Sequence, residues 1–139
     1  MISRWVLVVL LGLQAHFAAS YLVPLDAPSQ REFGGLLRWF WPWSYGDSGL
    51  PGPITAGQDL PTTGLFLALT AATVFGLAAL ATVGLWVPST WWPALAAIGA
   101  VLLVCLMALF FGPTKLAPLA FALGTLYTVL AKPAVVGIG

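Results

Sequence analysis

The last 80 residues of this chain, from Leu60 to Gly139, carry only two charged side chains, Lys115 and Lys132. Soluble domains contain about 25% charged residues, which keep their surfaces hydrated. In the whole chain of 139 residues, 60% are apolar and 6% are charged. A chain of this composition is solvated largely by lipid. The sequence therefore predicts an all-α integral membrane protein, because helices satisfy their own backbone polar groups in a bilayer.

Four apolar segments are long enough to cross the hydrocarbon layer, which takes about 20 helical residues. Pro24, Pro88 and Pro133 end three of them, because proline cannot continue a helix. Pro93 lies in the first turn of the third segment, where its missing N–H costs little. The sequence predicts one membrane domain over residues 1–139, with four transmembrane helices at about residues 4–23, 62–87, 90–112 and 114–132.

The segment 24–61 is the main extramembrane region and holds six of the nine charges. Ser29 and Glu32 have the spacing of a capping box at the start of a helix. Large apolar residues then recur at helical spacing as far as Trp41, and Pro42 ends the run. This pattern predicts one short amphipathic helix in the membrane interface, followed by a Gly/Pro-rich connector.

Tryptophans mark the two membrane faces, because the indole ring is apolar and carries one N–H that favours headgroup depth. In the four-helix arrangement one group lies at one face and the second at the opposite face. The first group is Trp5, Trp86, Trp91 and Trp92, and the second is Trp39, Trp41 and Trp43.

Orientation depends on the start of the chain. Arg4, an apolar stretch and the small residues Ala18, Ala19 and Ser20 are typical of a secretory signal, which we interpret here as a retained signal-anchor helix. This favours a cytoplasmic N-terminus in a bacterial cytoplasmic membrane. The count of positive charges on the two sides points slightly the other way.

Small residues recur every four positions in three of the segments. The stripes are Gly64, Ala68, Ala72, Gly76 and Gly84, then Ala96, Ala100, Ala108 and Gly112, then Ala120, Gly124 and Thr128. Small residues allow helix backbones to approach closely in a membrane. We expect the stripes to pack the last three helices together, and one of them could instead face another protein.

His16 is the only histidine and the only ionisable residue inside the apolar part of a predicted span. Such groups are functional candidates. Neutral imidazole is a good axial ligand for a macrocycle metal, and its neighbours Ala15, Ala18 and Ala19 are small. His16 could equally bond a neighbouring helix or an interfacial water, or contact a proton path or quinone. Gln14, two positions away on a helix, is expected to point elsewhere.

The run Trp39, Trp41 and Trp43 is a second candidate. It predicts interfacial anchoring, or contact with a lipid, a quinone, a carotenoid or a chlorophyll-type pigment. We identify no catalytic residues and no metal site, since the sequence has no carboxylate pair, phosphate loop, Cys/His cluster or nucleophile arrangement. The chain is therefore not expected to be an enzyme, and its net charge of +1 does not favour nucleic acid.

Residues 60–133 resemble the last three helices of DoxX-like small four-helix membrane proteins. The similarity lies in two Ala/Gly/Leu-rich helices, the turn from Trp86 to Trp92 that joins them, and a short final helix. The long Trp-rich segment after the first span departs from the family pattern. The resemblance implies a connection to quinone-linked oxidoreductase components.

The leading hypothesis is an accessory or structural subunit of a larger respiratory or photosynthetic electron-transfer complex in a membrane. Its partners would be lipids and larger membrane subunits. The alternatives are a DoxX-like quinone-linked component and a pigment-binding subunit with His16 as macrocycle ligand.

Overall fold

The computed structural model describes residues 3–22, 62–109 and 115–131, and over these residues the chain is helical. The predicted interfacial helix and Trp39, Trp41 and Trp43 lie outside the described residues. The elements are α1 (Arg4–Ala19), η1 (Ser20–Leu22), α4 (Thr62–Val83), η3 (Ser89–Trp91), α5 (Trp92–Leu109) and α6 (Leu116–Ala131).

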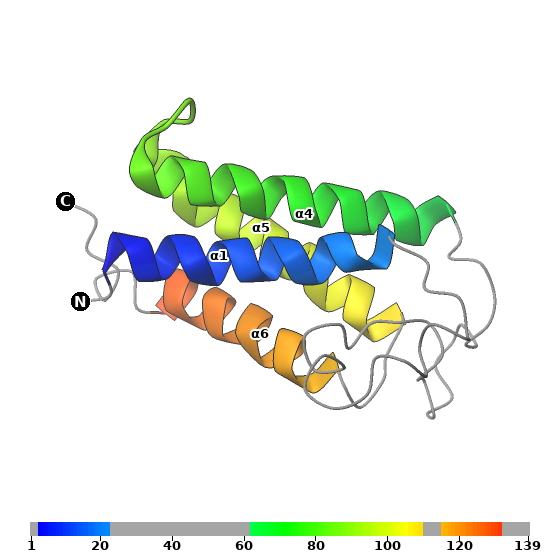
Figure 1. The fold of residues 1–139 in the computed structure, drawn as a ribbon. Helices are drawn as coiled ribbons and strands as arrows, with labels where there is room; N and C mark the ends of the chain where they lie inside the picture. Colours follow the sequence, from blue (N-terminus) through cyan, green and yellow to red (C-terminus); the bar gives the residue numbers. More distant parts are fainter. Residues whose placement is uncertain (1–2, 23–61, 110–114, 132–139) are drawn as a thin grey trace, which may run out of the picture.

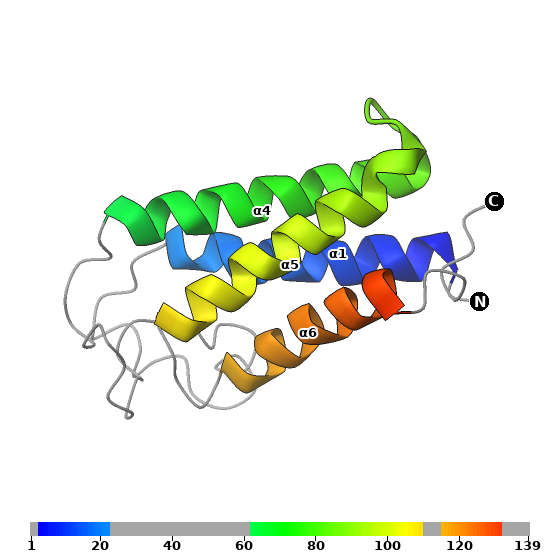
Figure 2. The ribbon, with the colours of Figure 1, turned by 180° about the vertical axis from the view of Figure 1, so that it is seen from behind.

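The four α-helices of the described residues form an antiparallel bundle (Figure 1). α1 packs along α4, α4 along α5, and α5 along α6, whereas α6 approaches α1 at few points. Figure 2 shows α5 running between α4 and α6 on the far side of the bundle. The start of α1, the end of α4, the start of α5 and the end of α6 all lie at one end (Figure 1).

Three of the predicted spans are present as helical segments that are long and apolar enough to cross a membrane. They are Arg4–Leu22, Gly64–Val83 and Ser89–Leu109. The fourth, α6, is apolar but has 16 residues and is shorter. The prediction of an all-helical membrane protein is therefore confirmed for the described residues, as far as helix type and three candidate spans. The membrane crossing of α6 stays a prediction.

The end of α4 corrects the predicted boundary at residue 87. The helix ends at Val83 because Gly84 takes a left-handed conformation with φ of +69°. The Gly84 N–H donates to the Ala81 carbonyl at 3.0 Å, and the Leu85 N–H donates to the Leu80 carbonyl at 3.0 Å. This is a Schellman motif, which satisfies the last carbonyl groups of a helix. Pro88 lies farther along and does not set the boundary.

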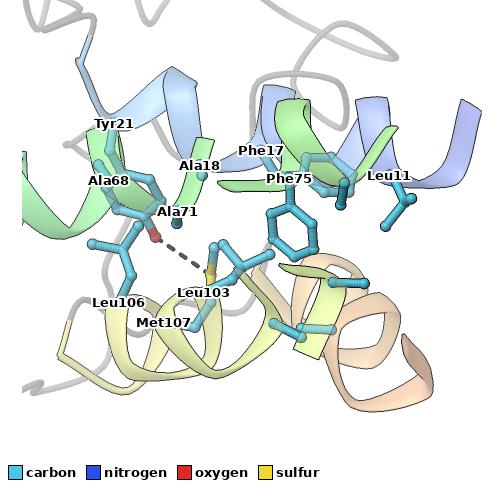
Figure 3. Packing of buried hydrophobic residues seen from close by; sticks show 14 of the residues in the cluster. Leu11, Phe17, Ala18, Tyr21, Ala68, Ala71, Phe75, Leu103, Leu106 and Met107 are labelled. Carbon is cyan, nitrogen blue, oxygen red and sulfur yellow. Dashed lines mark hydrogen bonds between the residues drawn. The ribbon is translucent and has the colours of Figure 1, made fainter. Parts of the chain in front are cut away.

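The core lies where α1, α4 and α5 meet (Figure 3). A close contact joins α4 to α5: a Cβ placed on Gly99 would lie 3.1 Å from the Phe75 ring. At one end of the core, the Tyr21 hydroxyl donates to Met107 Sδ at 3.5 Å. The fully buried side chains of the core include Leu11, Ala18, Ala68, Ala71, Phe75, Ala78, Ala96, Ala100, Leu103, Leu106 and Met107.

The stripe prediction was wrong in part. In α4 the buried face runs through Ala68, Ala71, Phe75 and Ala78, with steps of three and four, and Gly76 lies off this face. A strict four-residue step rotates about 40° per step around a helix of 3.6 residues per turn, so it cannot stay on one flat contact face. In α5 the first two members are buried and Ala108 is exposed.

Candidate functional site

A cavity of about 330 Å³ lies between α1 and α6. It forms because α6 packs closely on α5 but reaches α1 at few points. Ala120 and Gly124, one turn apart on α6, are too small to fill the gap. We call this cavity the α1/α6 groove. Its lining residues are Leu7, Leu10, Gln14, Trp92, Ala120, Phe121, Gly124, Thr125, Thr128 and Val129.

A polar pair joins α1 to α6 in the groove wall. The Gln14 amide Nε2 donates to Thr125 Oγ1 at 2.9 Å, and the Thr125 hydroxyl lies 3.2 Å from Gln14 Oε1. Gln14 Nε2 also donates to the Leu10 carbonyl oxygen at 3.3 Å. Gln14 is only 1% exposed. Because each polar group in the pair has a partner, the pair can lie in an apolar bundle without a large desolvation cost.

Aromatic rings bound the groove beyond this pair. The Phe17 ring of α1 lies 6.1 Å from the Phe121 ring of α6, measured between centroids. On the groove wall the Thr128 hydroxyl bonds back to the Gly124 carbonyl oxygen at 2.7 Å. The groove therefore presents mainly hydrocarbon, and the side-chain polar groups of Gln14, Thr125 and Thr128 are bonded within its wall.

His16 does not lie in the groove. It is in the last turn of α1 and is exposed. Its ring centroid is 6.4 Å from that of Phe17. Trp5, Val9 and Gly12 are exposed on the same side of the helix, because the steps between them are three or four residues. We call these four residues the outer face of α1.

Lys115 lies just before α6, outside the three candidate spans, at the bundle end that holds Tyr21. Its Nζ is 5.2 Å from the centroid of the Tyr21 ring, a cation–π arrangement. The side chain is only 7% exposed. Burial lowers the pKa of Lys115 from 10.5 to about 8, because the charged ammonium is disfavoured away from water.

Sequence reasoning missed the Gln14–Thr125 pair as a structural link. It did predict that Gln14 points away from His16, and this is confirmed, because Gln14 is buried and His16 is exposed. A usable signal was present, since an amide in an apolar span needs a polar partner on a neighbouring helix. The predicted stripe of Ala120, Gly124 and Thr128 lines the groove.

No protein-family model matches this sequence, and neither a curated protein nor a solved structure matches it. The resemblance to DoxX-like proteins, and the quinone link that it implies, therefore stay predictions.

Proposed function

We propose that this protein is an accessory subunit of a larger membrane complex, of the respiratory or photosynthetic electron-transfer kind. In this proposal α6 is the fourth transmembrane helix, and the N-terminus is cytoplasmic in a bacterial cytoplasmic membrane. The subunit would act by position, filling space between larger subunits and holding lipids or pigments at the contact.

Two helical glycines that make no close packing contact among the described residues support the proposal. A Cβ placed on Gly12 of α1 or on Gly76 of α4 would meet no heavy atom within 4 Å. Glycine in a helix interior costs about 1 kcal/mol relative to alanine. A helix from another subunit could approach closely at these glycines, and its packing would offset this cost. Small residues are enriched at helix contacts in membranes for this reason.

The experiment is extraction in a mild detergent, followed by size and native mass measurement. We expect the wild-type chain to migrate in a complex far above its own mass of 14.6 kDa. Gly12→Leu and Gly76→Leu should release it from the complex while helix content is retained, because a Cβ at either position meets no heavy atom of the described residues within 4 Å.

Leu77→Phe is the matched control, since Leu77 is exposed on α4, is already large and lies about 100° around the helix from Gly76. It should leave the complex intact. A wild-type chain that extracts as a stable monomer, or glycine variants that stay in the complex, would contradict the proposal.

A second candidate, pigment binding by His16, has one favourable observation. Gly12 lies one turn before His16 on the outer face of α1, so the surface beside the imidazole has no side chain at that position. A flat macrocycle with His16 as axial ligand would need such a surface. In this case the complex absorbs visible light, and His16→Leu changes the spectrum; an unchanged spectrum argues against ligation.

A further inference from the structure

We propose that the α1/α6 groove holds one acyl chain of an acidic phospholipid, with the phosphate beside Arg4. The proposal rests on the volume, the chemistry and the position of the groove, and it is independent of the outer face of α1.

The volume matches a hydrocarbon chain and is too small to enclose a helix. A cavity of about 150 Å³ holds one benzene molecule, so the groove, at about 330 Å³, has space for roughly a dozen carbon atoms. A helix with its side chains is about 10 Å across or more, and a few turns of it would need several times this volume. The groove therefore takes a single flexible chain.

The wall chemistry also favours an acyl chain. Leu7, Leu10 and Val129 present hydrocarbon to the groove. The polar groups of Gln14 and Thr125 bond one another. A saturated or unsaturated chain can enter without breaking this pair, whereas a ligand with a polar group at this depth would have to compete with it.

The position of the groove indicates where the lipid headgroup lies and which charge it carries. From Gln14 the lining runs about 10 Å along α1 to Leu7, at 1.5 Å per residue. Phe17 and Phe121 bound the Gln14 end. At the other end Trp92 lines the groove, and the exposed Arg4 lies one turn beyond Leu7 on the same side of α1. A guanidinium at the membrane face attracts an anionic headgroup.

The test is native mass spectrometry of the full chain in detergent. The probes are palmitoyl-oleoyl phosphatidylglycerol and the zwitterionic palmitoyl-oleoyl phosphatidylcholine, each added at the same concentration. Gly124→Phe fills the groove from within, because a Cβ at Gly124 meets no atom within 4 Å. Ala120→Leu is a second filling variant, and Leu123→Phe changes an exposed neighbour outside the lining.

We expect one tightly retained phosphatidylglycerol per wild-type chain. Occupancy should fall about tenfold in Gly124→Phe or Ala120→Leu, because the new side chain displaces contacts of roughly two methylene groups. Leu123→Phe should bind like the wild type. Arg4→Gln should remove the preference for phosphatidylglycerol over phosphatidylcholine and keep chain binding.

The filling variants are judged only if they keep the helix content of the wild type. If such a variant retains phosphatidylglycerol as the wild type does, the proposal is overturned. Retention of an isoprenoid quinone in place of phospholipid, or loss of a second protein chain from the groove-filled variants, would also overturn it. Because Gly12 and Gly76 lie outside the groove lining, the complex can dissociate in their variants while lipid retention persists, so the two proposals fail separately.

Discussion

Gln14 and Thr125 form a polar link between α1 and α6, which otherwise approach each other at few points. Other threonines of this bundle bond the carbonyl oxygen of the preceding turn, as Thr70 does to Phe66 at 2.7 Å. The Thr125 hydroxyl instead faces the Gln14 amide. Loss of Gln14 would leave Thr125 able to bond back to its own helix, which limits the cost of the loss.

We therefore expect a modest coupling between these residues. In a double-mutant cycle of Gln14→Leu and Thr125→Val, the interaction free energy should be about 1 kcal/mol, within the range of interhelical hydrogen bonds in membranes. Equilibrium unfolding in mixed detergents measures it. Additive effects of the two substitutions would mean that the pair contributes no stability.

Lys115 gives the stability a pH dependence. Its pKa in the folded state is about 8, below the unfolded value of 10.5. Between these values the unfolded chain binds more protons, so stability rises with pH; the penalty is fully present below pH 8. From pH 7.5 to 9.5 the free energy of unfolding should rise by about 2 kcal/mol.

The matched variant for this prediction is Lys115→Met, whose unbranched side chain is one atom shorter and cannot titrate. The measurement is unfolding at a series of pH values for both proteins. If the free energy of unfolding of the variant rises as steeply with pH as that of the wild type, Lys115 is not the group responsible.

At the scale of single elements, the end of α4 is the most sharply defined feature. The Schellman motif at Gly84 needs a positive φ, which glycine takes without strain and which costs other residues about 1 kcal/mol. Trp86, two residues later, also has a positive φ of 61°. The turn that carries the exposed Trp86 and Trp91 thus depends on an unusual backbone path.

Gly84→Ala should destabilise the protein by about 1 kcal/mol, although a Cβ there meets no atom within 4 Å. Gly76→Ala, in the interior of the same helix and equally free of neighbours, should stabilise it by up to about 1 kcal/mol through helix propensity. Thermal unfolding in one detergent compares the two. Equal changes in the unfolding temperature for both variants would show that the backbone conformation at Gly84 does not affect stability.

For the whole molecule, the antiparallel bundle predicts which residues share a membrane side. One end of the bundle holds the start of α1, the end of α4, the start of α5 and the end of α6 (Figure 1). Residues at these four positions should be accessible to a reagent from the same side of the membrane. If α6 crosses the membrane, as proposed, its two ends lie on opposite sides of the membrane.

Cysteine labelling in sealed vesicles tests this arrangement, in a background where the single Cys105 is replaced by alanine. Ser3→Cys, Thr90→Cys and Ala131→Cys should react from the same side, and Leu116→Cys from the other. Labelling of Leu116→Cys and Ala131→Cys from one side would show that the shorter helix α6 does not cross.

The sequence by itself determined the class of protein and the approximate places of its helices. Charge depletion after Leu60 and runs of apolar residues are local properties, so they can be counted without a fold. The start of the helix that contains Pro93 could be predicted for the same reason. The end of α4 could not, because Pro88 was the stop that the sequence predicted, and only the backbone path shows that the helix ends earlier, at Gly84.

The tertiary structure alone decided which face of each helix is buried and where the groove lies. Spans that are apolar on every side carry no periodic signal to mark an inner face, so spacing of small residues misassigned part of α4. The Gln14–Thr125 bond joins residues 111 positions apart. Such a pair, and the cavity beside it, depend on the rotation of α1 relative to α6, which no local pattern encodes.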